Sequence, residues 1–221
     1  MLKMKTRAAL AAAFLFAGAA GAATTDGIAN GSFEAIAGSL PAGWAVADSS
    51  PAVLSNDAHS GAHSVLLSVP GGFGGSGLLQ DSVAHGGLAP LTAANVGDAP
   101  LLTFWAKGDV SPTGNVKFAL SYMNGGTVLA DSGLQFFQND INTSGWTQIS
   151  FQGAAIPAGT TSIFLLFNTA VGPLLDGRSD AVYIDDVQLT LHTAAVPEPS
   201  SYALLLAGLT VVGAIARRRR A

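Results

Sequence analysis

The sequence predicts an all-β domain, a jelly-roll β-sandwich, between two terminal segments of a different kind. Between residues 28 and 193, short apolar or alternating runs are separated by Gly, Pro, Asn and Asp, and no long stretch has apolar residues at helical spacing. Many short strands separated by turn residues are typical of a sandwich or jelly roll. The chain of 221 residues has no cysteine, which excludes a disulfide framework. A domain of about 165 residues can bury a sufficient core without one.

The expected strands follow one another with turn residues between them. In chain order they span residues 44–47, 63–69, 77–83, 101–107, 116–123, 134–138, 146–151, 161–168 and 181–191. Alternation is clearest in the strand 116–123, where the even-numbered residues from Val116 to Tyr122 share one apolar face. Gly125 and Gly126 follow that strand and favour a hairpin turn, because glycine tolerates positive φ.

Residues 1–23 have the order of a secretory signal peptide. Basic residues at positions 3, 5 and 7 precede an apolar run over residues 8–20, and small residues follow. A positive flank, a short apolar core and a small-residue cleavage site together direct export. We expect cleavage after Ala22 or Ala23. The alternative is a buried N-terminal helix.

Residues 195–221 form a second ordered pattern. It consists of a Pro-Glu-Pro motif, an apolar run and an arginine cluster, namely Pro197, Glu198 and Pro199, residues 202–216, and Arg217, Arg218, Arg219 and Arg220. The prolines favour a stiff extended linker. The apolar run is expected to form a single transmembrane helix, at the short end of the length that spans a bilayer. The arginine cluster would orient this helix by staying in the cytoplasm.

This tail resembles the PEP-CTERM sorting signal, in which the same three parts occur in the same order at the C-terminus. The resemblance implies recognition by an exosortase, a membrane cysteine protease thought to cut near the Pro-Glu-Pro motif. The protein would be anchored in the inner membrane through the helix before processing, and would then reach the cell surface or the extracellular matrix. The alternative is a tail anchor that is never cut.

The charges of the chain are unevenly distributed. The formal net charge is −4, but residues 24–196 hold three basic and thirteen acidic side chains, which gives this part a net charge of −10. An acidic domain is not suited to binding nucleic acid, which requires clustered positive charge. We therefore expect no nucleic-acid partner and a domain that its charge keeps soluble.

A second resemblance extends over the domain, residues 24–194. The segments that carry it are 30–34, 41–44, 58–66, 102–108, 145–149 and 183–189. In this order they resemble galactose-binding-like jelly rolls and many carbohydrate-binding modules. The resemblance implies the jelly-roll fold, which hosts sugar binders, adhesins and modules without a known ligand.

The same resemblance implies a structural Ca²⁺ ion that ties the first strand to the last. Its ligands would be Glu34 and either Asp185 or Asp186. Adjacent carboxylates in an otherwise apolar strand must be paired, solvated or bound to a metal, and hard oxygen ligands suit Ca²⁺. The alternative is that one Asp faces solvent and the other caps a loop.

Trp105 is the candidate carbohydrate-binding residue. If Leu102, Phe104 and Ala106 face the core, alternation places Trp105 on the opposite face of its strand. A flat exposed ring can stack on a pyranose while nearby polar groups bind the hydroxyls. The alternative is burial of Trp105 against a loop. Trp44 and Trp146 match core positions of the resembling family and are interpreted as packing residues.

The sequence contains no catalytic motif, and we expect no enzyme. Most carboxylates occur in turns rich in Gly, Ser or Asn, where solvation is their ordinary state. The leading interpretation is an exported, non-enzymatic protein that binds extracellular polysaccharide. The alternatives are a structural matrix or biofilm protein without a specific ligand and a glycoside hydrolase, whose carboxylate pair is defined by spatial distance and not by sequence.

Overall fold

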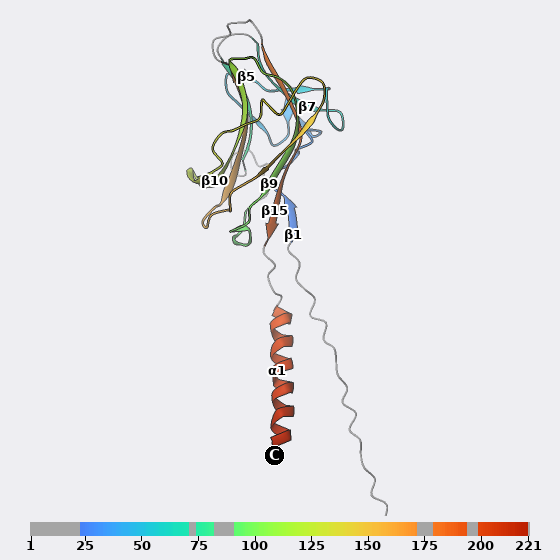
Figure 1. Ribbon diagram of the computed structural model, residues 1–221, viewed down its shortest axis with the longest axis vertical. Coiled ribbons are helices and arrows are strands. Elements are labelled where there is room, and N and C mark those ends of the chain that lie inside the picture. The colour runs from blue at the N-terminus through green and yellow to red at the C-terminus, as the bar shows by residue number, and fades with distance from the viewer. Residues whose placement is uncertain (1–22, 71–73, 82–90, 172–178, 194–198, 221) are drawn as a thin grey trace, which may run out of the picture. The chain divides into compact units, whose positions relative to one another are not determined.

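The computed structural model describes residues 23–70, 74–81, 91–171, 179–193 and 199–220. The described residues divide into the unit Ala23–Ala194 and the C-terminal segment 199–220, which belongs to a separate unit. The first unit is a sandwich of two β-sheets (Figure 1), which confirms the expected all-β class. The expected signal peptide falls on residues 1–22, which lie outside the described residues, and on Ala23.

The first sheet has the strand order β13-β9-β15-β7-β6, with β1 also paired to β15. Its strands are β13 (Thr147–Gln152), β9 (Leu101–Asp109), β15 (Asp180–Thr193), β7 (Ser64–Val69), β6 (Val53–Ser55) and β1 (Ala23–Asp26). All of these pairings are antiparallel. A bulge interrupts the register of β15 and β9 between Asp185 and Gln188.

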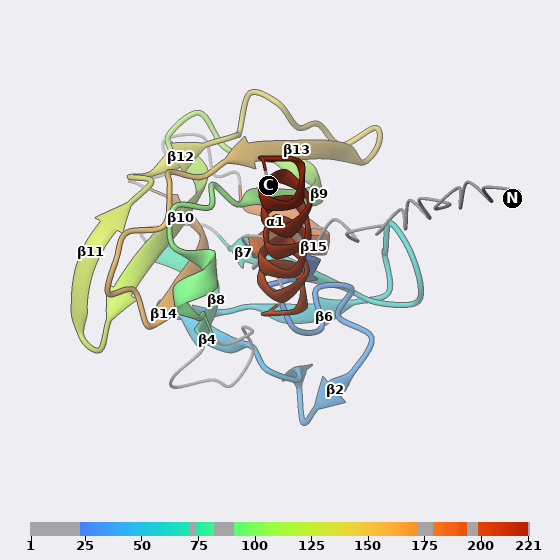
Figure 2. The same ribbon diagram turned by 90° about the horizontal axis from the view of Figure 1, so that it is seen from below.

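The second sheet has the strand order β11-β10-β14-β8-β4, with β12 paired to β10 and β5 to β8. Its strands are β11 (Thr127–Asp131), β10 (Gly114–Asn124), β14 (Ser162–Val171), β8 (Gly74–Asp81), β4 (Ala45–Ala47), β12 (Gln135–Phe136) and β5 (Ser50–Pro51). A separate two-stranded ribbon joins β2 (Ile36–Ala37) to β3 (Leu40–Pro41), and a 3₁₀ turn, η1, spans Ala93–Asn95. Figure 2 shows the two sheets as separate layers.

Alternation in the central strands places one face of each sheet in a shared core. In β9, Leu102, Phe104 and Ala106 are fully buried while the residues between them are partly exposed. In β10 the even-numbered residues from Val116 to Tyr122 are buried, as the sequence predicts. The period of two in a strand therefore decides which side chains lie on the outer face of the first sheet.

Aromatic rings fill the space between the sheets. Phe104 of the first sheet contacts three rings edge-on, with centroid distances of 5.5 Å to Phe118, 5.2 Å to Phe137 and 4.9 Å to Phe167. Edge-to-face contacts at such distances add to the stabilisation from burial alone. The buried residues of the cluster lie between Ile28 and Leu191, so the unit Ala23–Ala194 contains its own core.

Each strand expected from the sequence is found in the structure. Their ends differ from expectation by at most three residues. The hairpin of β10 and β11 turns at Gly125 and Gly126, with Asn124 paired to Thr127 and Gly125 at φ +56°. The sequence did not indicate β1, β6, β11 or the two-residue strands β2, β3 and β5, because exposed and edge strands lack apolar alternation. In β1 all residues are exposed.

The C-terminal segment forms one helix, α1 (Pro199–Arg220). Within the described residues, no helix has the length and apolar content needed to cross a membrane. Pro197 and Glu198 lie outside the described residues, and Pro199 begins the helix.

Candidate functional site

Four ring-bearing side chains gather on the outer face of the first sheet. They are Trp105 on β9, Trp146 just before β13, Tyr183 on β15 and His59 from the connection between β6 and β7, and we call them the aromatic cluster. The sheet brings three of them together because β9 lies between β13 and β15. All four are partly exposed. The outward placement predicted for Trp105 is confirmed.

The rings of the cluster contact one another in a chain. The His59 ring stacks on Trp105 with centroids 3.9 Å apart and planes 13° from parallel. His59 also meets Trp146 edge-on at 5.9 Å, and Trp146 meets Tyr183 edge-on at 6.5 Å. One ring face of Trp105 is therefore covered by His59.

Lys107 and Asp57 provide charge beside the aromatic cluster. The Lys107 ammonium lies 5.1 Å from the centroid of the Trp146 ring and 5.4 Å from that of Tyr183. It is also 2.5 Å from Oδ1 of Asp57. Cation–π attraction to the Lys107 ammonium stabilises the Trp146 and Tyr183 rings in their positions, and Asp57 holds the ammonium there. The Lys107 side chain is only 17% exposed.

The prediction that the other two tryptophans are core residues is confirmed for Trp44 and wrong for Trp146. Trp44 is buried in the core, where its ring meets Phe33 edge-on at 5.3 Å and its Nε1 donates to the carbonyl of Asn30 at 3.1 Å. Trp146 is not a core residue, because it lies partly exposed against Tyr183 and Lys107. A residue that precedes a strand has no alternation to indicate its face, and only the tertiary contacts decide it.

Three carboxylates predicted as calcium ligands bind the segment His59–His63 directly. Asp185, fully buried, accepts hydrogen bonds on Oδ2 from the backbone N–H groups of His59 at 2.8 Å and Ser60 at 3.2 Å. Its Oδ1 accepts one from the N–H of Asp186 at 2.7 Å. We call Glu34, Asp185 and Asp186 the carboxylate clasp.

The other two members of the clasp bind the same segment through side chains and backbone. Asp186 contacts Nδ1 of His59 at 2.7 Å, and its Oδ1 accepts from the hydroxyl of Ser60 at 2.8 Å. Oε1 of Glu34 accepts from the N–H groups of Ala62 and His63, both at 2.8 Å. The clasp therefore holds His59, and with it the imidazole that stacks on Trp105.

A close backbone contact between Gly31 and β15 supports the clasp. At the β15 bulge, the N–H of Val187 donates to the carbonyl of Gly31 at 2.9 Å. A Cβ on Gly31 would lie 1.8 Å from the carbonyl oxygen of Val187, so only glycine permits this approach. Asp186 has φ +47°, a left-handed conformation that is uncommon for residues other than glycine.

The environment shifts the pKa values of two clasp carboxylates in opposite directions. The N–H groups of Ala62 and then His63 lower the pKa of Glu34, because they favour the ionised form. Burial raises the pKa of Asp185, and the N–H groups that it accepts counteract this only in part. Desolvation thus dominates at Asp185.

The oxygens of the clasp carboxylates accept hydrogen bonds from the protein itself. Among the described residues, no group of three or more His, Asp or Glu side chains could hold a metal ion. Asp185 and Asp186 use all four carboxylate oxygens for protein donors. Ca²⁺ takes six to eight oxygen ligands, which include carbonyls and waters as well as carboxylates. Calcium binding stays a prediction that rests on the family resemblance alone.

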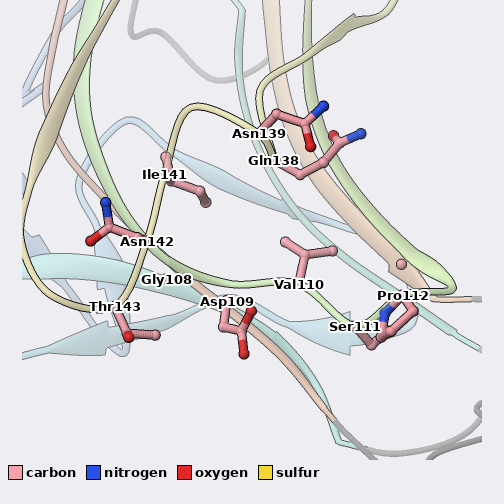
Figure 3. Close-up of a pocket in the computed structure, with 11 residues that line it drawn as sticks. Gly108, Asp109, Val110, Ser111, Pro112, Gln138, Asn139, Ile141, Asn142 and Thr143 are labelled. Atoms are coloured by element: carbon pink, nitrogen blue, oxygen red, sulfur yellow. The ribbon is translucent and has the colours of Figure 1, made fainter.

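A polar pocket of about 470 Å³ lies between two connections at the edge of the sandwich (Figure 3). Residues 138–143, which follow β12, arch around one side, and the turn from β9 into β10 closes the other. A smaller cavity of about 160 Å³ shares Gly108, Asp109 and Thr143 with it and also contacts Lys107 and Tyr183. The pocket therefore continues towards the aromatic cluster.

Sequence reasoning did not identify His59, Tyr183 or the polar pocket as parts of a site. Tyr183 carried a usable signal, since it alternates with the buried Val182 and Ile184 in β15. His59 and the pocket carried none, because they depend on how connections far apart in the sequence meet.

The C-terminal segment matches a known sorting motif, and the β-sandwich is similar in fold to solved structures. The family model of the PEP-CTERM protein-sorting motif matches residues 195–220. The chain thus carries this motif, as the sequence predicts, and the motif implies export and sorting by an exosortase. No curated protein matches the chain in sequence.

Several solved structures are similar to the domain. The enzymatically active domain of Bacteriophage CBA120 tailspike protein 4 is 19% identical with a TM-score of 0.53, covering 75% of this chain and 21% of its own. TmCBM61 in complex with beta-1,4-galactotriose is 18% identical with a TM-score of 0.47, covering 75% and 97%. The CBM22-1 xylan-binding domain of Paenibacillus barcinonensis Xyn10C is 16% identical with a TM-score of 0.44, covering 74% and 93%.

These likenesses concern the fold alone. The chain spans about a fifth of the length of the tailspike chain, 21%, so no activity follows from that match. At such low identity, function must be argued from the residues of this site.

Proposed function

We propose that this protein is a non-enzymatic module that binds a neutral polysaccharide at the cell surface or in the extracellular matrix. Its β-sandwich, of the jelly-roll type, would contact the glycan, and its PEP-CTERM tail would deliver it through an exosortase. The observation that carries the proposal is the aromatic cluster. Trp105, Trp146 and Tyr183 are partly exposed on one sheet face, beside polar groups.

The cluster has the chemistry that sugar recognition uses. Pyranose rings present apolar C–H faces and hydroxyl edges, so a binding site combines aromatic surface with a few placed polar groups. Tyr183 lines a small cavity together with Asp57, Asp109 and Thr143. Trp146 meets the Tyr183 ring edge-on and extends the aromatic surface. His59 already covers one face of Trp105, which favours Trp146 as the main stacking residue.

Calorimetric titration of the full-length protein tests this proposal. Suitable probes are xylan fragments, β-1,4-galactotriose and cellohexaose, with tri-galacturonic acid as a charged comparison. We expect Trp146→Ala to weaken binding of the preferred neutral probe by about 10- to 100-fold, the loss typical of a central aromatic contact. Trp105→Ala should have a smaller effect, because part of its ring surface is already covered.

Phe136→Ala provides the matched control. Phe136 is also an aromatic side chain, 53% exposed, but it lies on β12 of the second sheet. Its replacement should leave the affinity unchanged. If Trp146→Ala and Trp105→Ala bind the glycan as tightly as wild type does, the aromatic cluster is not the glycan-binding surface.

A structural matrix role is the second candidate. It is favoured by exposed apolar side chains on and beside β11 and β12 of the second sheet, namely Val128, Leu129, Leu134 and Phe136. Such a surface suits contact with another protein. Absence of binding to every neutral probe, together with self-association measured by sedimentation, would favour this role over glycan binding.

A glycoside hydrolase remains the third candidate, because Asp57 and Asp109 line the same small cavity. Asp57 is already paired with Lys107, whereas hydrolysis needs one carboxyl group free to donate a proton. Release of reducing ends from the neutral probes by the wild type, abolished in Asp109→Asn, would establish hydrolysis.

Processing of the tail is tested separately by the mass of the exported protein. If an exosortase cuts near Pro199, the mature chain ends before the apolar run 202–216. A secreted chain that ends beyond Ala216 would contradict the proposed sorting.

A further inference from the structure

The rings of the aromatic cluster carry polar atoms that the domain leaves without a partner. Nε1 of Trp105, Nε1 of Trp146 and the hydroxyl of Tyr183 make no hydrogen bond within the described residues, and neither does Nε2 of His59. The buried polar side-chain atoms that lack a partner in the described part of the chain belong to other residues, namely Ser76, Ser111 and Gln138. The four polar atoms of the cluster are therefore accessible from the surface.

The buried aromatic residues of the core differ in this respect. Nε1 of Trp44 donates to the carbonyl of Asn30 at 3.1 Å. The hydroxyl of Tyr122 donates to the carbonyl of Ala154 at 2.6 Å. Tryptophan and tyrosine usually find such a partner when they are buried, and they are enriched at binding surfaces, where one end of the side chain stays wet. The polar atoms of the aromatic cluster are thus available to a ligand.

Asp186 determines which nitrogen of His59 is available. Nδ1 of His59 lies 2.7 Å from Oδ2 of Asp186. An ionised carboxylate only accepts hydrogen bonds, so Nδ1 carries the proton of the neutral imidazole and Nε2 keeps its lone pair. The two nitrogens point in different directions from the ring, and Nε2 is directed away from Asp186. The His59 side chain is 28% exposed, so a ligand can reach this acceptor.

The position of this acceptor is fixed before any ligand binds. The imidazole stacks on the Trp105 ring with centroids 3.9 Å apart. Asp185 accepts hydrogen bonds from the backbone N–H groups of His59 and Ser60, at 2.8 Å and 3.2 Å. A preorganised group loses less entropy when it binds.

His59 places an acceptor beside groups that only donate. Its ring meets Trp146 edge-on at 5.9 Å. The indole N–H of Trp146 and the ammonium of Lys107 have no acceptor capacity. A sugar hydroxyl both donates and accepts, so it can donate to Nε2 of His59 while it accepts from a neighbouring donor. A deoxy or O-methylated sugar has no proton to donate at that position.

We propose that His59 is a specificity-determining residue of the aromatic cluster, whose Nε2 accepts a hydrogen bond from a free hydroxyl group of the neutral sugar residue that stacks on Trp146. This inference rests on the proposed function. It narrows the ligand class to neutral polysaccharides whose hydroxyl groups are unsubstituted at this position. Asp186 acts through His59, because it keeps the proton on Nδ1 and leaves Nε2 as the acceptor.

Calorimetric titration of the full-length protein with its preferred neutral oligosaccharide, and with monodeoxy derivatives of that oligosaccharide, tests the acceptor. One derivative should bind wild type about 3- to 10-fold more weakly than the parent, the effect of losing one hydrogen bond between neutral groups. In His59→Phe, which keeps an aromatic ring over Trp105, this derivative and the parent should bind equally. A merely structural role of His59 would weaken both by the same factor.

His192→Phe provides the matched control. Nδ1 of His192 also contacts a carboxylate, Oδ1 of Asp98 at 3.2 Å, and its side chain is exposed near the C-terminal end of β15, apart from the aromatic cluster. This variant should keep the affinity of wild type and its discrimination against the deoxy derivative. His59→Gln should also keep the discrimination, because its amide oxygen can take the place of Nε2, whereas the shorter His59→Asn should lose it.

A second measurement observes the acceptor in the wild type itself. Long-range ¹H–¹⁵N NMR spectra of the imidazole rings are recorded in mildly alkaline buffer, where histidine is ordinarily neutral. Nδ1 of His59 should carry the proton, and the oligosaccharide should shift the Nε2 signal saturably while the His192 signals stay unchanged. A proton on Nε2 in the free protein, or an Nε2 signal that stays unchanged on binding, would overturn the inference.

The outcomes separate this inference from the proposed function. If Trp146→Ala weakens binding and His59→Phe discriminates against the deoxy derivatives as wild type does, the role of His59 is overturned and the glycan-binding function stands. If the discrimination disappears in His59→Phe but Trp146→Ala binds as wild type does, the acceptor stands and stacking on Trp146 is overturned. If no neutral probe binds and none shifts the Nε2 signal, both are overturned.

Discussion

Removal of the carboxylate of Asp185 should destabilise the domain strongly. In Asp185→Ala, the backbone N–H groups of His59, Ser60 and Asp186 lose their acceptor. Asp185 is fully buried, so water replaces the carboxylate only if the segment His59–His63 moves away from β15. The stacking of His59 on Trp105 would be lost with that movement.

The magnitude follows from the three hydrogen bonds and the burial. A hydrogen bond to a charged group contributes about 1.5–3 kcal/mol. The burial that raises the pKa of Asp185 offsets part of this sum, because a desolvated carboxylate itself costs free energy. We expect a net loss of about 2–4 kcal/mol, which for a domain of this size lowers Tm by roughly 5–15 °C.

Urea unfolding of the full-length protein, monitored by tryptophan fluorescence, measures this loss. Trp105 reports directly, because its ring lies under His59. The matched control is Asp131→Ala on β11, where an exposed carboxylate accepts the nearby N–H of Gly133 at 2.7 Å. That variant should lose no more than about 1 kcal/mol.

Two results would refute the reasoning. If Asp185→Ala and Asp131→Ala unfold at the same urea concentration, the buried carboxylate does not hold the segment. If a calcium chelator lowers the Tm of the wild type but not that of Asp185→Ala, a metal ion and not the three N–H groups satisfies the clasp, since a ligand that binds the native state stabilises it.

The remaining predictions concern the close contact at Gly31, the pH dependence of stability and a buried tyrosine. Gly31→Ala should lower stability by about 3 kcal/mol or more, because its Cβ would overlap the carbonyl of Val187; unchanged urea unfolding would contradict the close approach. The pKa of Glu34 is lowered in the folded state, so its stabilisation is present above the unfolded value near 4.5 and is lost as the pH falls through the folded value. Unfolding curves between pH 3 and 7, as a rough range spanning the carboxylate pKa, should show a weaker acid dependence in Glu34→Gln, and identical slopes would oppose this. Burial raises the pKa of Tyr122 to about 12, and its hydroxyl donates to Ala154 at 2.6 Å. The ultraviolet difference between wild type and Tyr122→Phe should therefore show no phenolate below about pH 11, and earlier ionisation would show that this tyrosine is accessible.

The strands of the core could be predicted because the alternation of apolar and polar residues indicates which side chains are buried. In β9 and β10 a period of two separates buried from exposed residues, and Phe104 and Val116 fall on the expected side. The edge strand β11 could not be predicted in this way, because its residues are mostly exposed and carry no alternation. Hydrophobic patterning indicates buried residues, and an edge strand buries few residues.

Part of the candidate site could be predicted for the same reason. Trp105 lies on the outer face because its neighbours in β9 face the core. For Glu34, Asp185 and Asp186, the sequence does not indicate which hydrogen-bond donors meet them, because a pair of adjacent carboxylates does not select its partners. Backbone N–H groups of the segment His59–His63 meet them in this fold.

The sequence by itself determined the all-β class, the positions of the central strands along the chain, the outward position of Trp105 and the PEP-CTERM motif. Each depends on local order along the chain, whether a period of two, turn residues or a linear motif. Only the tertiary structure decided that Trp146 joins the aromatic cluster, that the clasp binds His59 and Ser60, and that Ser111 and Gln138 share a pocket. These contacts join connections that lie far apart in sequence, and strand pairing and loop packing, not local preference, bring them together.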